Sequence, residues 1–511
     1  MSRRADWLFG LALTAIVITA FAPACDVFLG GDDFEWLDAS YKLFVDPLAG
    51  FELINSFFRP LVKWTFAIDY LIFGDFAPGY MLTNIGIHLV NVLMLYMLMA
   101  RHLRRPVAAA AAAAFGLSPL DSEAVLWASG RPDTVLLLFW LGALLLLDWD
   151  VDPPPRSRFA AFLVTALLGI GAKESWVLFP LIATGFLVLV KGSAPGSAVR
   201  RLWILWLAFG AYVVVFILRP VLTGWSSPAH YADFGFQSAV AKTSRTLLGF
   251  LGLGGAELGT AAAFVLAAVL VFGAMLAAWY TRNGLAQWAV VWMLTTLAIS
   301  APFPVAPLRH NYLPIVGFWM VVAALADHAF GRDRAGSIWN STGRRAASIL
   351  AIVGVVAVLS VEGRALQLEI DDYRRYGEVH RELTGLFRSV APAISIDRPL
   401  LLINDGTRAA VEEVVNEVGG VDKTFFVRRD ALWQLVFLPP LANFMGTPFD
   451  VLLRPVAATE ISGALAGEVT VVYFDDRGFR LLPEAPGVVA ESFARTGRLP
   501  PGTGLFQYEI Y

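Results

Sequence analysis

Long apolar runs, separated by short charged loops, fill the chain from Trp7 to about Val361 and constrain its fold more than any other feature. About 20 apolar residues in helical form cross a bilayer core. Charged residues make up only 16% of the chain, against about 25% in soluble proteins. Charges and turn residues return after about Glu362. The sequence therefore predicts an α-helical membrane region over residues 1–361 and a folded domain over residues 362–511.

Eleven apolar stretches are predicted to cross the membrane as helices. They are Trp7–Ala24, Tyr80–Ala100, Pro106–Leu120, Ala124–Leu147, Phe159–Ala172, Ser175–Val190, Leu202–Leu218, Leu258–Tyr280, Leu285–Ala301, Tyr312–Ala326 and Ala346–Val361. The first stretch also resembles a secretory signal, because Arg3 and Arg4 precede it. Pro23 is unsuited to a cleavage site, so we expect a retained helix rather than a cleaved signal.

The charges of the loops alternate from one predicted side of the membrane to the other. The loop of residues 25–79 holds nine acidic and three basic residues, whereas Arg101, Arg104 and Arg105 gather in the next loop. The positive-inside rule then places the N-terminus in the cytoplasm. An odd number of spans puts residues 362–511 outside, on the same side as the loop 25–79. The Ala- and Arg-rich composition suggests a bacterial inner membrane, with an endoplasmic reticulum membrane as the alternative.

Overall charge and cysteine content exclude several classes of function. The net charge is −3 and no run of Lys and Arg is present, so we expect no nucleic-acid partner. Cys25 is the single cysteine, which excludes an intramolecular disulfide and a cysteine-based metal site.

Three acidic residues, Asp32, Asp33 and Glu35, follow the first span directly. Carboxylates this close repel one another, which raises the pKa of one and prepares it for proton transfer. They are equally able to hold a divalent cation such as Mg²⁺ or Mn²⁺, so the metal stays open. A solvated loop with acids that cap a helix is the simpler alternative.

Arg59 and Lys63 open an amphipathic stretch that reaches about Phe73. Four residues apart, they share one face of a helix, and aromatic residues flank them. These features are typical of a helix that lies at the membrane interface, where two cations suit a lipid phosphate. Simple snorkelling of both side chains to lipid headgroups fits the same pattern.

Asn84, His88 and Asn91 form a polar stripe along one face of the second span. Polar side chains within a membrane span must face protein or water. Interhelical hydrogen bonding is the favoured interpretation, ahead of a direct chemical role for His88.

Further ionisable groups gather at the predicted outer ends of later spans. Ionisable side chains in or near a membrane are energetically costly, so their presence there predicts a function. The groups are Asp121, Glu123, Arg131, Asp133, Lys173, Glu174, Arg309 and His310, with Tyr312 next to the last. Lys173 and Glu174 are adjacent, and an ion pair between them would limit the penalty of burial. Acids and bases at one depth and on one side predict a site.

The order of these motifs resembles the GT-C class of membrane glycosyltransferases, and within it the protein O-mannosyltransferase type. The matching pieces are Asp32-Asp33, Arg59-Pro60-Leu61, Thr83-Asn84, His88-Leu89-Val90-Asn91, Ser118-Pro119, Glu123-Ala124-Val125, Gly130-Arg131-Pro132-Asp133, Lys173-Glu174 and Arg309-His310-Asn311-Tyr312-Leu313-Pro314. The similarity covers residues 25 to 320, and includes the relatives that carry tetratricopeptide repeats. No 34-residue repeat is present in this chain.

This resemblance implies an inverting transfer of a sugar from a polyprenyl-phosphate donor to an acceptor hydroxyl outside the membrane. Asp32 would be the general base, with Asp33 the close second. Developing charge on the leaving phosphate would be stabilised by basic residues. The candidates for that role are Arg59, Lys63, Arg131, Lys173 and Arg309, and the supporting residues are Glu35, His88, Glu174, His310 and Tyr312.

The C-terminal region is expected to form a small α/β domain. Predicted helices are Asp371–Arg388 and Arg408–Val418, and predicted strands are Pro399–Asn404, Thr424–Val427, Phe449–Leu453, Val469–Phe474 and Phe506–Tyr511. Extracytoplasmic domains vary among GT-C enzymes and bear on the choice of acceptor. The acceptor is therefore left open between a protein, a lipid and a glycan.

Two functions from other classes compete with sugar transfer. A transporter or flippase for a lipid-linked or anionic substrate would also need many spans and buried polar groups. The polar groups here cluster at one face rather than at the midplane, and no inverted repeat is evident, which favours the enzyme. A membrane scaffold that has lost activity is the third interpretation.

Overall fold

The structure of this protein is a computed structural model, and 14 segments of it are described. They are residues 3–30, 32–54, 57–74, 76–149, 154–218, 236–251, 259–300, 308–331, 341–388, 400–404, 450–453, 470–475, 478–481 and 504–509.

Helices dominate the described residues. The α-helices are α1 (Arg3–Phe21), α2 (Asp33–Val45), α3 (Pro60–Phe73), α4 (Ala77–Met99), α5 (Arg105–Gly116), α6 (Glu123–Leu126), α7 (Arg131–Leu147), α8 (Arg156–Leu168), α9 (Phe179–Gly185), α10 (Pro195–Arg201), α11 (Trp203–Tyr212), α13 (Phe236–Gly249), α14 (Thr260–Tyr280), α15 (Gly284–Ser300), α16 (Tyr312–Gly331) and α17 (Ser341–Arg388). Short 3-10 turns include η3 (Pro119–Asp121), η4 (Ala128–Gly130), η6 (Glu174–Leu178) and η10 (Leu308–Asn311).

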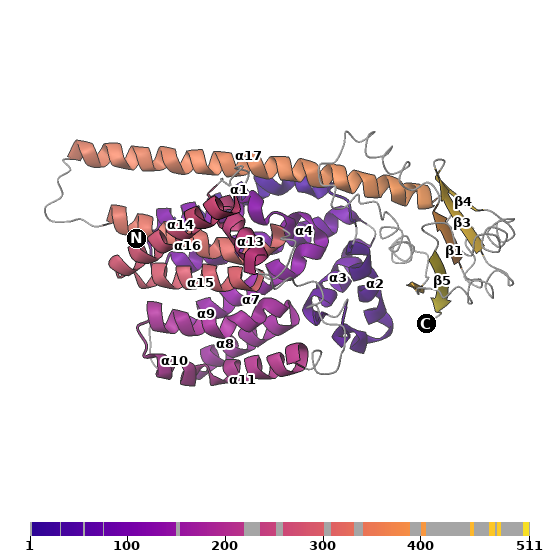
Figure 1. The fold of residues 1–511 in the computed structure, drawn as a ribbon, viewed down its shortest axis with the longest axis horizontal. Helices are drawn as coiled ribbons and strands as arrows, with labels where there is room; N and C mark the ends of the chain where they lie inside the picture. Colours follow the sequence, from indigo (N-terminus) through magenta and orange to yellow (C-terminus); the bar gives the residue numbers. More distant parts are fainter. Residues whose placement is uncertain are drawn as a thin grey trace.

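The long helices lie side by side as a bundle, and α17 runs along one edge of it (Figure 1). Helix α4 packs against α1, α5 and α7, and α16 packs against α5 and α15. Helices α2 and α3 pack on each other at the end of the bundle that faces the C-terminal strands (Figure 1). The prediction that the first span is a helix is confirmed, since α1 is part of the packed bundle.

Many helices begin with proline at the first or second position, including α3, α4, α5 and α7. Proline is suited to this position because the first amide groups of a helix have no partner within it. At these positions the backbone changes from loop to helix within one or two residues.

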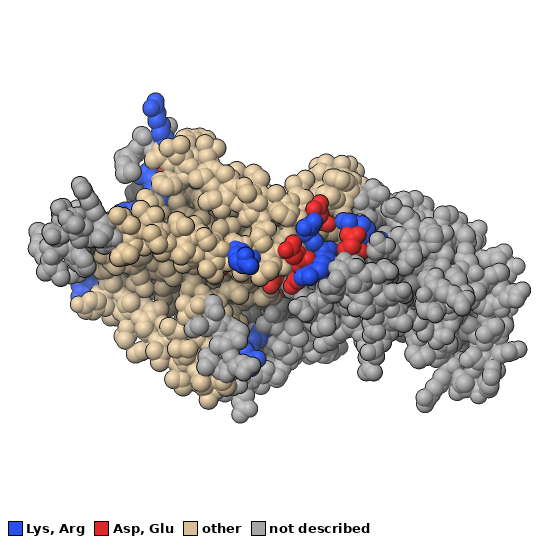
Figure 2. Space-filling view, turned by 90° about the horizontal axis from the view of Figure 1, so that it is seen from above, with Lys and Arg blue, Asp and Glu red and all other residues tan. Residues whose placement is uncertain are grey.

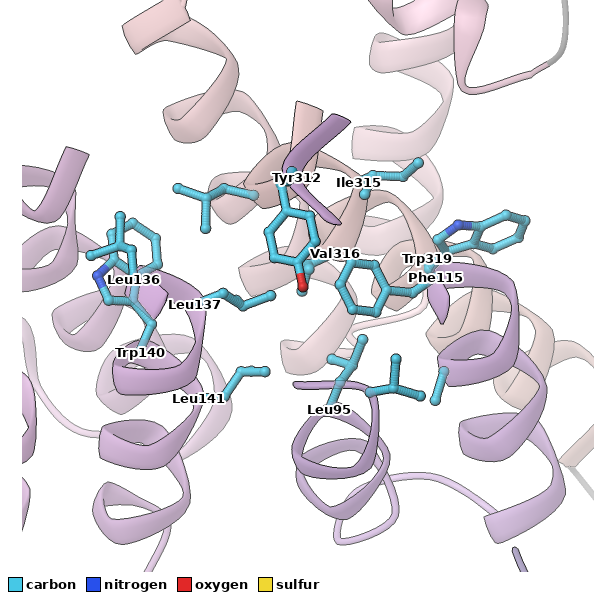
Figure 3. Packing of buried hydrophobic residues seen from close by; sticks show 14 of the residues in the cluster. Leu95, Phe115, Leu136, Leu137, Trp140, Leu141, Tyr312, Ile315, Val316 and Trp319 are labelled. Atoms are coloured by element: carbon cyan, nitrogen blue, oxygen red, sulfur yellow. The ribbon is translucent and has the colours of Figure 1, made fainter. Parts of the chain in front are cut away.

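Large aromatic and aliphatic side chains fill the interior of the bundle. Trp140, Trp288 and Trp292 are fully buried, and their rings meet edge to face. The close view in Figure 3 shows Tyr312 with its hydroxyl group between Leu137, Phe115 and Leu95. A hydroxyl in such surroundings requires hydrogen-bond partners, because an unsatisfied polar group is costly in an apolar interior.

Within the described residues, six helices are long and apolar enough to cross a membrane, or up to seven if the bent pair Pro195–Arg201 and Trp203–Val215 counts as one span. They are Arg4–Asp26, Ala77–Met99, Ala128–Leu147, Ala261–Tyr280, Leu308–Ala329 and Ile349–Glu378. The other predicted spans are helical but shorter, such as Gly284–Ala298. The membrane region is confirmed, whereas the count of eleven spans is not.

Helix α17 corrects one predicted boundary. We expected the last span to end at Val361 and a separate helix, Asp371–Arg388, to belong to the outer domain. The structure instead joins both in one helix of 48 residues. No proline interrupts residues 341–388, and charged side chains do not by themselves end a helix.

The described part of the C-terminal region contains five strands, which form a mixed sheet: β1 (Leu400–Asn404), β2 (Asp450–Leu453), β3 (Thr470–Asp475), β4 (Gly478–Leu481) and β5 (Gly504–Glu509). Their order is β2-β5-β1-β3-β4, with β1 and β3 parallel and the other neighbours antiparallel. Four of the predicted strands overlap β1, β2, β3 and β5, and β4 was not predicted. Predicted elements Arg408–Val418 and Thr424–Val427 lie outside the described residues, so the α/β domain as a whole stays a prediction.

Candidate active site

Asp33 begins α2 and is held firmly by the chain around it. One carboxylate oxygen accepts hydrogen bonds from the amide (2.7 Å) and hydroxyl (2.5 Å) of Ser129, and the other accepts from the amide of Gly30 at 2.9 Å. Its side chain is buried. Burial raises the pKa of Asp33 to about 7, although these hydrogen bonds act in the opposite direction. Asp33 therefore ties its own loop to η4.

Asp32 precedes Asp33 and differs from it in exposure. The residue is exposed on the surface of the loop. Protein atoms around its carboxylate limit hydration, and this raises its pKa, while the positive charges of Arg309 and Arg59 lower it. Of the two acids, Asp32 is the one that an incoming molecule can reach. Glu35 lies one helical turn further along α2 and is half-buried.

Arg59 and Glu174 form the first ion pair beside Asp32. The guanidinium Nε and Nη2 donate to the two carboxylate oxygens of Glu174 at 3.0 and 2.7 Å. The same guanidinium lies over the ring of Phe57, with 4.2 Å from Cζ to the ring centroid. A bidentate pair stacked on an aromatic ring holds the guanidinium in one orientation.

Lys173 pairs with Asp133 rather than with its neighbour Glu174. Its Nζ donates to both oxygens of Asp133, at 2.7 and 2.6 Å. The expected contact between Lys173 and Glu174 is therefore wrong. Lys173 has extended backbone angles, φ −161° and ψ 151°. In extended backbone successive side chains point to opposite sides, so the two charges turn away from each other.

Arg309 on η10 forms the third pair, with Glu123 at the start of α6. Its backbone amide also donates to Glu123, at 3.3 Å, and its guanidinium lies over Trp127 with 4.8 Å from Cζ to the ring centroid. Because segments 186 residues apart meet here, the pair connects η10 to α6.

These three bases lie close enough to influence one another. Lys173 is within electrostatic range of both Arg59 and Arg309. Asp32 is within range of Arg59 and Arg309. The result is a group of three cations, each with one carboxylate partner, next to one accessible carboxylate. We call Arg59, Lys173 and Arg309 the basic cluster.

Lys63 and Arg131 were predicted to share this role, but the structure gives them internal partners. Lys63 is buried and donates to the carbonyl oxygens of Ala49 and Glu52, both at 2.9 Å. Arg131 is fully buried, pairs with Asp69 at 2.7 Å and donates to Asn84 at 2.7 Å. Both bases therefore join segments of the protein to one another, and neither is placed in the basic cluster.

The polar stripe on α4 serves helix packing, as the sequence predicted. Asn84 donates to the carbonyl oxygens of Val125 and Trp127 at 3.3 and 3.0 Å. His88 Nε2 lies 3.3 Å from the Gly116 carbonyl oxygen, and Nδ1 lies 2.8 Å from the hydroxyl of Tyr312. Only a protonated Nε2 can donate to a carbonyl, so Nδ1 accepts from Tyr312. The supporting residues His88 and Tyr312 thus hold α4, α5 and α16 together.

Several residues around the site were not predicted from the sequence. Lys242 on α13 lies within electrostatic range of His310, as do Lys173, Arg309 and Arg59. Burial lowers the pKa of Lys242 to about 8. Tyr376 on α17 lies within range of Asp32 and Asp33. The sequence placed residues 362–511 on the same side of the membrane as the acidic loop, but it did not predict the contact between α17 and Asp26.

A metal site has no support among the residues that the structure describes. No group of three or more His, Cys, Asp or Glu side chains there is arranged to hold a metal ion. The divalent cation considered for the acidic cluster stays an untested prediction.

Three comparisons with known proteins bear on this arrangement. A family model described as dolichyl-phosphate-mannose-protein mannosyltransferase matches residues 59–223. The protein O-mannosyl-transferase Tmtc2 of Drosophila melanogaster is 33% identical over 178 residues, which are 32% of this chain and 18% of that protein. The chain therefore spans less than a fifth of the length of this curated relative.

A solved structure is similar over almost the whole chain. It is that of ArnT from Cupriavidus metallidurans bound to undecaprenyl phosphate, with a TM-score of 0.51, 15% identity, and coverage of 99% of this chain and 98% of that one. This likeness shows the fold. The family model and the curated relative are both of the protein mannosyltransferase type that the sequence resembles. Asp32 and Asp33 precede the segment matched by the family model, and Arg309 follows it.

Proposed function

We propose that this chain transfers a sugar from a polyprenyl-phosphate donor to a hydroxyl group of an acceptor, with inversion at the anomeric carbon. The observation that carries the proposal is the position of Asp32. Asp32 is an exposed residue whose loop is held by the neighbouring Asp33, and its carboxylate lies within electrostatic range of two members of the basic cluster. An accessible base beside several cations suits a reaction that removes a proton and releases a phosphate.

The reaction follows from these roles. Asp32 takes the proton of the acceptor hydroxyl, and the oxygen attacks the anomeric carbon of the donor sugar. A new carbon–oxygen bond forms as the bond between that carbon and the phosphate oxygen breaks. Polyprenyl phosphate leaves with the electron pair, and its added negative charge is stabilised by Arg59, Lys173 and Arg309. The attack comes from the face opposite the phosphate, which inverts the anomeric centre.

The donor class is supported by the relatives. The structural neighbour was solved with undecaprenyl phosphate, and the curated relative is named as a protein O-mannosyl-transferase. Mannose linked to polyprenyl phosphate is therefore the first donor to test. We place the site on the extracytoplasmic side of an inner membrane, with the N-terminus in the cytoplasm, because the loops follow the positive-inside rule. The acceptor, whether protein, lipid or glycan, is expected to approach from that side.

The direct test is a transfer assay with the full chain in liposomes. Radiolabelled polyprenyl-phosphate mannose is the donor, and envelope fractions from cells that lack the gene supply the acceptor. Sugar transfer into a macromolecular product, identified by mass spectrometry, is the expected result. Movement of the donor across a sealed bilayer without product would favour the transporter. Absence of both activities, with several donor sugars, would favour the scaffold.

Replacing Arg59 with Gln should weaken the use of the donor. A hydrogen bond to a charged group contributes about 1.5–3 kcal/mol, so the KM for the donor should rise about 10-fold or more. Glu174, the partner left behind, has 29% of its side chain exposed and can be hydrated. The measurement is the initial rate against donor concentration.

Arg101→Gln is the matched control, because this partly exposed arginine follows α4 at the end of the helix away from Asn84 and the site. Its donor KM should stay within twofold of the wild-type value. If the donor KM changes equally in both variants, the effect of Arg59→Gln does not come from a lost interaction with the donor phosphate.

Activity should rise with pH through the neutral range. The three hydrogen bonds to Asp33 require its ionised form, and the pKa of Asp33 is raised to about 7. Protonation as the pH falls therefore releases one of the donors that hold the loop, and Asp32 must also be ionised to act as a base. We expect kcat/KM to increase between pH 6 and 8, with an inflection near 7.

Ser129→Ala tests the assignment of this inflection. The variant removes the hydroxyl that donates to Asp33 and that lowers its pKa. The inflection should therefore move to higher pH. An unchanged profile in Ser129→Ala would mean that another group controls the pH dependence.

A further inference from the structure

The last third of α17 packs directly on the loop that leads to Asp32. Arg374 pairs with the carboxylate of Asp26 at 3.2 Å, and Arg381 donates to the carbonyl oxygen of Asp26 at 3.0 Å. The guanidinium of Arg381 also lies over the ring of Phe28, with 5.5 Å from Cζ to the centroid. Figure 2 shows a patch of acidic and basic side chains on an otherwise largely uncharged face. Arg374 and Arg381 also pair with Asp371 and Glu378 of the same helix. They attach α17 to the start of the loop.

Two glycines allow the helix and the loop to approach more closely than side chains would permit. A Cβ atom placed on Gly377 of α17 would lie 2.5 Å from the backbone nitrogen of Phe28. A Cβ atom on Gly30 would lie 2.6 Å from the ring of His380. Real Cβ atoms do not approach other heavy atoms this closely, so any larger residue at either glycine must displace the loop or the helix.

The opposite side of the loop is held by the bundle. The indole of Trp127 donates to the Gly30 carbonyl oxygen at 3.2 Å, and the Gly30 amide donates to Asp33 at 2.9 Å. Gly30 is therefore held by Asp33 at its amide, by Trp127 at its carbonyl oxygen and by the ring of His380 beside its Cα atom. Asp32 follows it by two residues, so a shift of α17 is transmitted to Asp32.

His380 contributes shape to this contact. The residue is buried, and its ring meets that of Tyr376 edge to face at 4.6 Å between centroids. Burial lowers the pKa of His380 to about 4, which keeps the imidazole neutral at physiological pH. The neutral ring of His380 therefore packs against Gly30 and fills the space beside the loop.

We propose that Gly377 and His380 are positioning residues for the transfer reaction, holding the loop of residues 26–33 so that Asp32 meets the acceptor hydroxyl. This inference rests on the proposed function of Asp32. It also gives α17 a second role besides crossing the membrane. The same helix leads on to the C-terminal strands and contacts β4, so the outer region and the catalytic loop share one rigid element.

The test compares two Gly→Ala substitutions in the same helix. Gly377→Ala should lower kcat roughly 10- to 100-fold, because a displacement of about 1 Å at reacting groups has effects of this size. The donor KM should change little, since the basic cluster comes from other elements. Gly354→Ala is the control: nothing lies within 4 Å of an added Cβ there, so kcat should be unchanged.

His380 provides a second pair of variants in case Gly377→Ala folds poorly. His380→Phe keeps a ring of similar shape and should retain most of the wild-type kcat. His380→Ala removes the ring and should lower kcat with little change in the donor KM. If kcat falls equally in His380→Phe and His380→Ala, the shape of the ring does not position the loop. A wild-type kcat in Gly377→Ala would also contradict the positioning role.

Hydrogen exchange separates this inference from the proposed function. In Gly377→Ala the amides of residues 27–33 should exchange faster than in the wild type, whereas the amides of α4 and α7 should not. This readout needs no transferase activity. Unchanged exchange in the loop would show that Gly377 does not hold residues 27–33 in place, and would overturn the inference. Faster exchange with a wild-type kcat would leave the transferase assignment intact and overturn the positioning role.

Discussion

Replacing Asp32 with Asn should reduce sugar transfer by about 10²- to 10⁴-fold, the usual contribution of general acid–base catalysis. Asparagine keeps the size of the side chain but cannot accept the proton of the acceptor hydroxyl. Because Asp32 is exposed and Asp33 supplies the hydrogen bonds of the loop, the variant should fold normally and bind the donor. The measurement combines initial rates of transfer with equilibrium binding of polyprenyl phosphate.

Two neighbouring acids make this result interpretable. Glu52→Gln changes another exposed acid within residues 25–79 and should leave the rate of transfer within twofold of the wild type. Asp33→Asn should act differently from Asp32→Asn, because an amide cannot accept all the hydrogen bonds of Gly30 and Ser129. That variant should lose about 1–3 kcal/mol of stability as well as activity. A rate for Asp32→Asn within twofold of the wild type would exclude Asp32 as the base.

The acidic pair shows what sequence reasoning can and cannot provide. Its position after an apolar run predicted that it lies at the end of a span, because hydropathy is a local property of the chain. The pattern did not separate the two acids, and the favoured choice of Asp32 came from a resemblance. The difference in exposure depends on Ser129 and Gly30, and the contact with Ser129 joins residues 96 positions apart.

The bases show a similar limit. All five candidates were predicted to face one ligand, because cations near a membrane surface often bind phosphate. Lys63 and Arg131 instead have internal acceptors, Ala49 and Asp69 among them. A sequence displays a charge without its partner, so a buried structural ion pair and an open binding residue look alike. The polar stripe on α4 was easier to predict, because three polar residues at helical spacing in an apolar span require partners on one face.

The boundary of the membrane region could not be predicted for a different reason. The change in composition near Glu362 is real, and it marks where α17 leaves its apolar part. A change in environment does not require a change in backbone conformation, and α17 continues as one helix beyond it. The contact of Arg374 with Asp26 places the last third of α17 beside the acidic loop, whereas the predicted location of both segments outside the membrane stays a prediction.

Replacing Arg131 with Met should destabilise the protein by about 3–5 kcal/mol, the usual effect of removing one partner from a buried ion pair. Asp69 would keep a buried charge, for which the described residues offer the hydroxyl of Thr83 as the remaining donor, and Asn84 would lose its bond to the guanidinium. The packing of Arg131 on Phe66, 4.1 Å from Cζ to the ring centroid, would be only partly replaced. Thermal unfolding in detergent should show a clearly lower Tm.

Arg105→Met is the matched control, because Arg105 pairs with Asp6 at an exposed position and such pairs contribute at most about 1 kcal/mol. Adding Asp69→Asn to Arg131→Met should recover part of the lost stability, since the unpaired charge is then gone. If Arg131 bound the donor phosphate instead, its variant would stay as stable as the wild type and raise the donor KM. The structure therefore predicts that Arg131 is needed for folding, whereas the proposed function assigns donor binding to the basic cluster, of which Arg59 and Arg309 lie within electrostatic range of Asp32.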